Sequence, residues 1–361
     1  MPGVYGKDGK SERVNYEEGE RMNQMEKILS ISIACYNVEK TLRETLEPLT
    51  ASGVLDALDV MIVDDGSRDK TAEIALEYQN RFPDTFRLIQ QANGGWGATV
   101  NTGIRRARGK YFKQLDGDDY YKPENMRDFI ACLTKTDADL VISPYLEYDE
   151  ATGNVMNTIN CNPGCEELKK LELSQVGGFA PFMHSLCVRT ELLRKGGVSV
   201  TEHCFYTDTE FVLKACNQAH TVLFFDKVIY CYRRASSGQS MSLAGFEKHY
   251  MEQFKVIRVL LEYREKQVTR PEIRAMYDQL LYGTCVWQYL IMLYIRPTLK
   301  RRSQFMDYDA MLKKLAPDYY ERIDLSIVKK LRKYHFFGFG IAARHKKKVD
   351  ARFTKDGKML Y

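Results

Sequence analysis

The stretch that decides the fold is LDVMIVDDGSRD, at residues 58–69. Its first half is apolar and rich in β-branched residues, which is typical of a buried strand. Two carboxylates, Asp64 and Asp65, follow directly at its end, and Gly66 then turns the chain. A strand that ends in acidic residues presents them at the rim of a sheet, which is where open α/β sheets bind their ligands.

The segments on either side repeat the alternation of strand and helix. Apolar runs predict strands at 28–35, 86–89, 111–115 and 138–144, and helical spacing predicts helices at 38–50, 71–82, 98–108 and 125–135. The pattern continues more loosely with strands at 182–188, 222–225 and 228–232 and a helix at 209–219. Short strands separated by helices are typical of βαβ units. We therefore predict an α/β fold with a mostly parallel sheet.

The composition indicates a globular chain of two or three domains. Of its 361 residues, 44% are hydrophobic and 28% are charged, which excludes disordered, collagen-like and coiled-coil proteins. We expect a flexible arm over 1–27, a sheet domain over 28–238 and a helical, basic region over 239–361. Nine cysteines are too few for a disulfide scaffold and indicate reduced thiols in the cytoplasm. No secretory signal or transmembrane helix is recognisable in the sequence.

Positive charge is concentrated towards the C-terminal end. Residues 291–361 contain 18 Lys and Arg against 7 Asp and Glu, whereas the whole chain has a net charge of +5. Membrane head groups or nucleic acid would both suit such a region. A solvated helical surface explains the charges equally well, and the aromatic residues between 250 and 287 are most simply the core of these helices.

Polar and acidic side chains follow three of the predicted strands. Their positions are Tyr36 and Asn37, then Asp64 and Asp65, and finally Asp116, Asp118 and Asp119. Five carboxylates at one rim repel one another unless a positive charge joins them. A hard divalent cation is the natural partner because it binds oxygen ligands and bridges to phosphates. Gly117 lets the backbone turn so that Asp116 and Asp118 face the same ion.

A glycine-rich stretch, NGGWGATVNTG at residues 93–103, opens one of the predicted helices. Close approach of the backbone at Gly94 and Gly97 to a diphosphate at the helix N-terminus would explain this composition. The stretch is not a G-x-G-x-x-G fingerprint, and no G-x-x-x-x-G-K-[ST] motif occurs in the chain. Neither a dinucleotide-binding fold nor a P-loop is therefore supported.

Four further residues have two interpretations each. Asp208 is either an N-cap or a general base that takes a proton from an acceptor hydroxyl. Arg233 and Arg234 either lie in a loop over a diphosphate or are surface charges. His184 is more readily explained as a core or surface histidine than as a ligand.

In these motifs and in their order, residues 28–235 resemble the family 2 glycosyltransferases, which have the GT-A fold. The segments that carry the resemblance are SIACYN at 32–37, VDDGSRD at 63–69, NGGWGATVNTG at 93–103 and LDGDD at 115–119. The resemblance implies a nucleotide-sugar donor, Mn²⁺ or Mg²⁺, and inversion at the anomeric carbon. The chain lacks the Gln-x-x-Arg-Trp signature of processive synthases, which implies transfer of one sugar per encounter.

The resemblance also implies roles for individual residues. Ala34, Tyr36 and Asn37 would line the base and ribose pocket, and Asp65, beside Asp64, would hold the nucleobase. The nucleotide-sugar would further contact Gly94, Gly97, Asn101, Asp116 and Gly117, while Asp116 and Asp118 would bind the metal. Asp208 matches the family's catalytic base, although Thr207 precedes it where the family usually has Glu.

We therefore expect a metal-dependent inverting glycosyltransferase that moves one sugar, with UDP-sugars as the first candidates, to a glycan or lipid-linked acceptor in surface polysaccharide or glycolipid synthesis. The expected location is the cytoplasm, with peripheral contact at the inner face of the cell membrane, and no nucleic-acid partner. One alternative is a catalytically silent glycan- or nucleotide-binding scaffold on the same fold. Another is a sugar nucleotidyltransferase, which would need a glycine-rich basic loop after its first strand.

Overall fold

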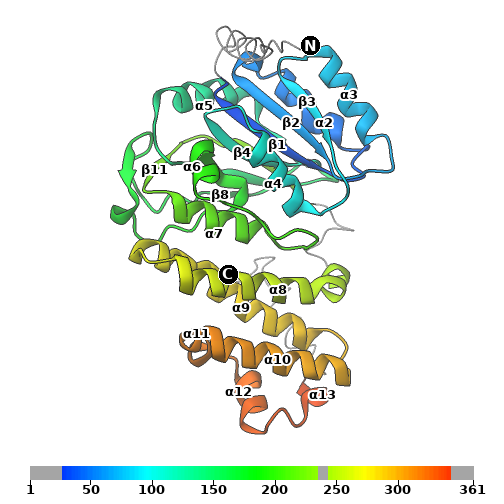
Figure 1. Ribbon diagram of the computed structural model, residues 1–361, viewed down its shortest axis with the longest axis vertical. Helices are drawn as coiled ribbons and strands as arrows, with labels where there is room; N and C mark the ends of the chain where they lie inside the picture. Colours follow the sequence, from blue (N-terminus) through cyan, green and yellow to red (C-terminus); the bar gives the residue numbers. More distant parts are fainter. Residues whose placement is uncertain (1–26, 235–242, 343–361) are drawn as a thin grey trace, which may run out of the picture.

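The structure is a computed structural model that describes residues 27–234 and 243–342. An α/β part, from blue to green in Figure 1, lies against a helical part, from yellow to red, along the long axis of the molecule. The expected arm at 1–27, apart from Lys27, and the expected domain boundary at 238 lie outside the described residues.

An eight-stranded sheet forms the centre of the α/β part, in the order β3-β2-β1-β4-β10-β6-β11-β9. Its strands are β1 (Leu29–Cys35), β2 (Leu58–Asp64), β3 (Phe86–Gln90), β4 (Tyr111–Asp116), β6 (Leu140–Ile142), β9 (Lys170–Glu172), β10 (Leu186–Arg189) and β11 (Thr221–Phe224). Strands β3, β2, β1 and β4 are parallel, whereas β10 runs antiparallel to both β4 and β6. The predicted α/β class is confirmed.

Helices cover the sheet and bury its strands. They are α2 (Leu42–Thr50), α3 (Thr71–Arg81), α4 (Trp96–Arg106), α5 (Pro123–Lys135), α6 (Thr190–Lys195) and α7 (Asp208–Gln218), with short 3₁₀ turns η2 (Leu55–Ala57), η3 (Leu173–Gln175) and η4 (Met183–Ser185). All seven residues of β2 are buried, which explains why this strand is mostly apolar. Helices α4 and α7 lie in front of the sheet in Figure 1.

A second sheet of four strands stands beside the first, in the order β5-β12-β7-β8. The strands are β5 (Tyr120–Tyr121), β7 (Tyr145–Asp149), β8 (Val155–Ile159) and β12 (Tyr230–Arg234). Only the strand at β12 was predicted from the sequence. Because β5 follows the acidic turn directly and pairs with β12, this sheet brings β12 next to the predicted site.

The helical part consists of six helices in the described residues. They are α8 (Leu243–Gln267), α9 (Pro271–Tyr294), α10 (Leu299–Leu315), α11 (Pro317–Arg322), α12 (Ser326–Lys333) and α13 (Phe339–Ala342). Tyr250, Phe254 and Tyr277 are buried, so aromatic residues between 250 and 287 do form part of the core. Among the helices described, none has both the length and the apolar composition needed to cross a bilayer.

Candidate active site

The acidic turn that follows β4 is anchored through Gly117. Its N–H donates to the carbonyl of Ala34 (3.0 Å), and its carbonyl accepts from the hydroxyls of Thr41 (2.9 Å) and Thr45 (3.0 Å) at the start of α2. A Cβ at this position would lie 2.9 Å from the Ala34 oxygen, so the close approach requires glycine. The turn is therefore fixed against the carboxyl end of β1, as the strand pattern predicts.

Asp119 and Arg233 hold the acidic turn from the side of the second sheet. The buried carboxylate of Asp119 accepts from the hydroxyl of Tyr230 (2.6 Å) and from the backbone N–H of Arg233 (2.7 Å). The Arg233 side chain donates to the carbonyl of Asp118 (2.6 Å) and forms an ion pair with Glu44 (2.5 Å). Because Arg233 is only 8% exposed, it is not a surface charge, and its side chain holds the acidic turn in place.

Three carboxylates converge at Asp116. The pKa of Asp116 is raised to about 7, mainly by burial and also by the charges of Asp118 and Asp208, while a hydrogen bond from Trp96 opposes the rise. That bond joins the indole Nε1 of Trp96 to Oδ1 of Asp116 at 2.7 Å. The charge of Asp208, which lies far along the chain, also acts on Asp116, so the fold brings these two carboxylates near each other.

A candidate metal centre consists of Asp116, Asp119 and His184, whose ligand atoms all lie within 4.8 Å of one another. The imidazole of His184 lies between the rings of Tyr145 and Tyr232, with centroids 4.9 and 4.6 Å away. Its Nδ1 is buried and has no hydrogen-bond partner among the described residues. Burial lowers the pKa of His184 to about 3, so the ring is neutral and its lone pair is free for a cation.

This grouping differs from the pair Asp116 and Asp118 that the sequence predicts. The chain makes a tight turn in which the N–H of Asp119 donates to the carbonyl of Asp116 (3.1 Å), and this turn puts positions i and i+3 together. Asp118 is partly exposed next to the group, and burial raises its pKa. No spacing in the sequence relates His184 to the acidic turn, so the sequence favours a core or surface histidine at this position.

On the nucleotide side, Asp65 organises the glycine-rich loop. Its carboxylate accepts from the side-chain amide of Gln91 (2.7 Å) and from the backbone N–H groups of Gly94 (3.0 Å) and Gly95 (2.7 Å). Asp64 accepts from a backbone N–H in the turn after β2 (3.0 Å). Both carboxylates lie at the predicted rim of the sheet, and both accept hydrogen bonds from backbone N–H groups there.

Tyr36 and Asn37 occupy the end of β1 as expected. Tyr36 is half exposed at the rim. Asn37 has a left-handed backbone, with φ of 54°, and its side-chain oxygen accepts from the N–H of Arg68 (2.8 Å). This hydrogen bond joins the loop after β1 to the loop after β2. The two loops in which the base and ribose pocket is predicted are therefore fixed relative to each other.

Gly97 and Asn101, both in α4, contact the segment 199–207 that leads to Asp208. A Cβ at Gly97 would lie 2.2 Å from the carbonyl oxygen of Thr201. The Asn101 amide donates to the carbonyl of Val200 (2.9 Å) and accepts from its N–H (2.8 Å). Asn101 therefore fastens the segment that carries the predicted base, in addition to any contact with a donor phosphate that the resemblance implies.

We predict that Gly97→Ala destabilises the protein, because the new methyl group overlaps a backbone carbonyl that cannot rotate away. Overpacking of this kind costs about 1–3 kcal/mol. Chemical denaturation of the two proteins measures the difference in the free energy of unfolding. Gly177→Ala is the matched control, since a Cβ there meets nothing within 4 Å. Equal stability of Gly97→Ala and Gly177→Ala would show that the backbone at Thr201 can move away from the new methyl group at little cost in free energy.

Asp208 is the first residue of α7 and is exposed to solvent. The protein surroundings of its carboxylate nevertheless raise its pKa by desolvation. Two residues just before it have left-handed backbones, His203 with φ of 51° and Tyr206 with φ of 63°. Such conformations are costly for residues other than glycine and persist only where neighbouring structure enforces them.

Helix α8 contacts the segment just before Asp208 and stabilises it. The carboxylate of Glu252 accepts from the N–H of Phe205 (2.7 Å) and pairs with Nδ1 of His249 (2.6 Å). The rings of Phe205 and His249 stack with centroids 3.9 Å apart. The helical part thus fixes the approach to Asp208, a role that the sequence did not indicate.

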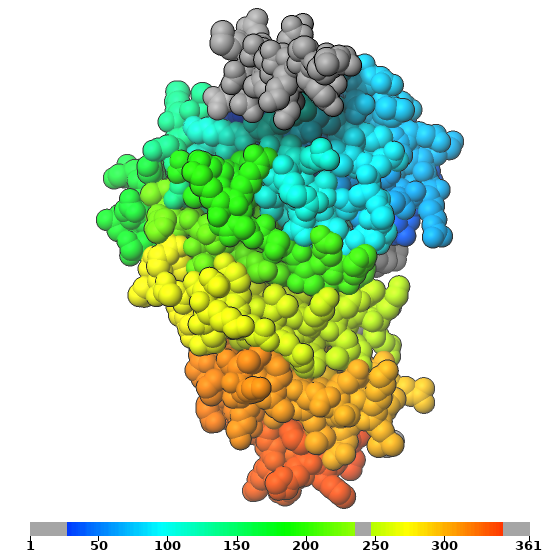
Figure 2. Space-filling view, in the orientation of Figure 1, coloured from blue at the N-terminus to red at the C-terminus, as the bar shows by residue number. Residues whose placement is uncertain are grey.

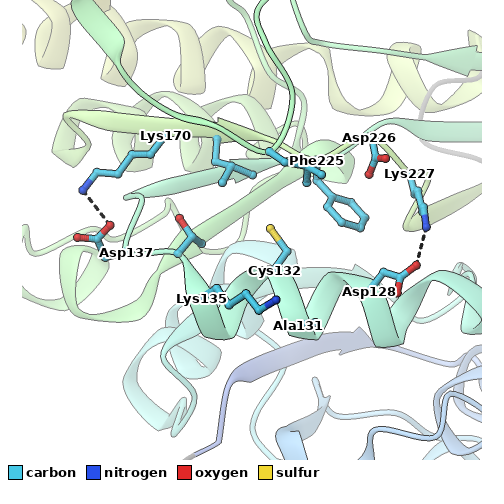
Figure 3. A pocket seen from close by; sticks show the side chains of 12 residues that line it. Asp128, Ala131, Cys132, Lys135, Asp137, Lys170, Phe225, Asp226 and Lys227 are labelled. Atoms are coloured by element: carbon cyan, nitrogen blue, oxygen red, sulfur yellow. Dashed lines mark hydrogen bonds and ion pairs between the residues drawn. The ribbon is translucent and has the colours of Figure 1, made fainter.

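A cavity of about 590 Å³ elsewhere in the α/β part does not belong to this site. Cys132 from α5 and Phe225 after β11 line it, and ion pairs of Lys170 with Asp137 (2.8 Å) and of Lys227 with Asp128 (2.5 Å) border it (Figure 3). None of its lining residues is a predicted site residue. We therefore define the candidate active site by the side chains around Asp116 and not by this cavity.

Comparisons with known proteins relate this chain to glycosyltransferases. The sequence profile described as Glycosyl transferase family 2 matches residues 30–190. The glycosyltransferase EpsJ of Bacillus subtilis is 30% identical over 57% of this chain and 61% of its own, and the putative glycosyltransferase EpsH of the same strain is 34% identical over 42% and 45%. The chain thus spans about half to two thirds of the length of these curated relatives.

Solved structures show the same fold. TarS of S. aureus, residues 1–349 in complex with UDP-GlcNAc, superposes with a TM-score of 0.65 at 19% identity, over 92% of this chain and 93% of that one. The superposition extends into the helical part, beyond the segment that the profile matches. The profile match identifies residues 30–190 as a family 2 glycosyltransferase segment, and the superposition shows that the chain has the GT-A fold.

Proposed function

We propose that the protein is a metal-dependent, inverting glycosyltransferase that moves one sugar from a nucleotide-sugar to an acceptor hydroxyl. The observation that carries this proposal is the convergence of Asp116, Asp118 and Asp208 beside the neutral imidazole of His184. UDP-sugars are the first candidates for the donor, because the structural neighbour TarS was solved with UDP-GlcNAc. The proposed acceptor class is a glycan or a lipid-linked glycan, in surface polysaccharide or glycolipid synthesis.

The residues at the acidic turn fit a divalent cation such as Mn²⁺ or Mg²⁺. Carboxylate oxygens from Asp116 and Asp119 and a ring nitrogen of His184 form a mixed oxygen and imidazole set of the kind that Mn²⁺ accepts. Such a cation, when bound, supplies Lewis-acid stabilisation of the departing nucleoside diphosphate. Trp96 and Arg233 hold the turn that carries these ligands, so the site is preorganised.

The proposed base is Asp208. Its carboxylate takes the proton from the acceptor hydroxyl as that oxygen attacks the anomeric carbon. Attack from the face opposite the leaving group inverts the configuration at that carbon. Gly97, Asn101 and Glu252 fix the segment that leads to Asp208, so positioning supplies part of the rate acceleration.

A screen of donor hydrolysis tests the proposal. The full chain is incubated with UDP-, GDP- or dTDP-sugars, with Mn²⁺ or with EDTA, and release of the nucleoside diphosphate is measured. We expect release from one donor class only, and at least about a tenfold loss with EDTA, since the cation stabilises the leaving group. Thermal stabilisation by the matching nucleoside diphosphate should likewise require the metal.

Binding of a nucleotide without release of diphosphate from any donor would favour a silent binding scaffold. Formation of a nucleotide-sugar from a sugar phosphate and a nucleoside triphosphate would instead identify a nucleotidyltransferase. Release that is unaffected by EDTA would contradict the metal dependence and leave the transferase proposal standing.

A further inference from the structure

The far end of the helical part exposes large apolar side chains. Leu299 at the start of α10 is 88% exposed, Tyr334 and Phe337 after α12 are 57% and 85% exposed, and Ile341 in α13 is 70% exposed. We call these four residues the apolar tip. Helices α12 and α13 form the red end of the molecule, on the side opposite the sheet (Figures 1 and 2).

The apolar tip is built on a fixed turn. The guanidinium Nε of Arg302 donates to the carbonyl of Phe336 (3.2 Å), which ties the first turn of α10 to the segment that follows α12. The ring of Phe336 packs inward against Phe305, with centroids 6.0 Å apart. His335 and Phe336 both have left-handed backbones, with φ of 51° and 60°. This costly conformation directs Phe336 inward while leaving Phe337 in solvent.

The two segments that carry the apolar tip are rich in positive charge. Segments 296–302 and 326–342 contain eight Lys and Arg and no Asp or Glu. Lys300, Lys330 and Lys333 are exposed, and none of these three has an ion pair with a carboxylate among the described residues. The sequence continues with Arg344 and three lysines at 346–348. These three lysines therefore add positive charge beside the apolar tip, whereas Arg301, Lys329 and Arg332 of the same segments pair with carboxylates.

We propose that the apolar tip binds the surface of a bilayer that contains anionic phospholipids. Phe337 and Ile341 would enter the boundary between head groups and acyl chains, and Lys300 and Lys333 would face the phosphates. A second copy of this chain is disfavoured as the occupant because it would bring two positive surfaces together. Nucleic acid would match the positive charges, but the aliphatic side chains of Leu299 and Ile341 would remain exposed to water. The proposal does not depend on the proposed transferase activity.

Co-sedimentation of the full chain with vesicles tests the proposal. Vesicles of phosphatidylcholine with one third phosphatidylglycerol are compared with pure phosphatidylcholine, at low and high salt. We expect binding to the anionic vesicles that weakens with salt. Phe337→Ser with Ile341→Ser should lower the partition coefficient at least about tenfold, because two apolar side chains no longer leave water. Lys300→Glu with Lys333→Glu should lower it by a similar factor, on anionic vesicles only.

The matched control is Val155→Ser with Met156→Ser, which removes two exposed apolar side chains of β8 and should leave vesicle binding unchanged. Circular dichroism and thermal melting establish that each variant folds. The proposal is overturned if the folded wild-type chain does not bind anionic vesicles, or if the apolar-tip variant binds as well as the wild type. A concentration-dependent dimer that the apolar-tip variant abolishes would assign this surface to a second copy instead.

Discussion

Replacing Asp208 with Asn is expected to reduce the rate of sugar transfer by about 10²–10⁴-fold, the usual contribution of a general base. Asparagine keeps the size and polarity of the side chain but cannot accept the proton of the acceptor hydroxyl. Asp208 does not belong to the candidate metal centre, so the affinity for donor and metal should remain close to that of the wild type. Steady-state kinetics under saturating donor should therefore show a loss of kcat with little change in the donor KM.

The pH profile gives a second readout of the same assignment. A base must be ionised to act, and desolvation raises the pKa of Asp208 above its ordinary value of 3.8. The wild-type rate should rise with increasing pH through that raised pKa, and the part of the rise that belongs to Asp208 should vanish in Asp208→Asn, which leaves the part set by Asp116. Asp226→Asn, which changes an exposed carboxylate of the other cavity, is the matched control. Full transfer by Asp208→Asn would mean that another group accepts the proton.

Replacing Asp116 with Asn is expected to remove the metal-dependent stabilisation of the protein by UDP and to lower the transfer rate by more than about 100-fold. Even residues in the outer shell of a metal site typically cost 10–100-fold when they are changed, and Asp116 lies at the centre of the group. Isothermal titration with Mn²⁺ and thermal melting with UDP and Mn²⁺ measure the two effects. Asp137→Asn, at an exposed ion pair with Lys170, should behave as the wild type.

His184→Gln distinguishes the metal centre seen in the structure from the pair expected from the sequence. If Asp116, Asp119 and His184 hold the cation, loss of the imidazole should lower Mn²⁺ affinity by at least about tenfold. An unchanged affinity, with a loss in Asp118→Asn instead, would restore the pair Asp116 and Asp118. In that case the neutral ring of His184 would serve only the aromatic stack with Tyr145 and Tyr232.

The parts of the site that lie at the ends of parallel strands could be predicted from the sequence. Asp65 and Asp116 follow apolar runs directly, and neighbouring parallel strands place their carboxyl ends at one rim. The same reasoning located Asn37 and Gly117. Local signals sufficed because strand and helix patterns depend on residues close together in the chain.

The interior partners of these residues could not be predicted in the same way. Arg233 had two interpretations, and only the pairing of β12 with β5 and β7 shows that it clamps the acidic turn. His184 lies 65 or more positions beyond that turn in a segment with weak periodicity. Short strands such as β5 and β8 leave little pattern, because their pairing is decided by partners far along the chain.

By itself, then, the amino-acid sequence determined the α/β class, the order of the strand-end carboxylates and the concentration of positive charge near the C-terminus. These follow from hydrophobic periodicity and residue type, which are properties of neighbours in the chain. Only the tertiary structure decided which carboxylates share a site with His184 and how Glu252 of α8 supports the segment before Asp208. It also decided that the apolar tip stands among unpaired lysines. The reason is that contacts between distant segments depend on the packing of the whole fold, which no local pattern encodes.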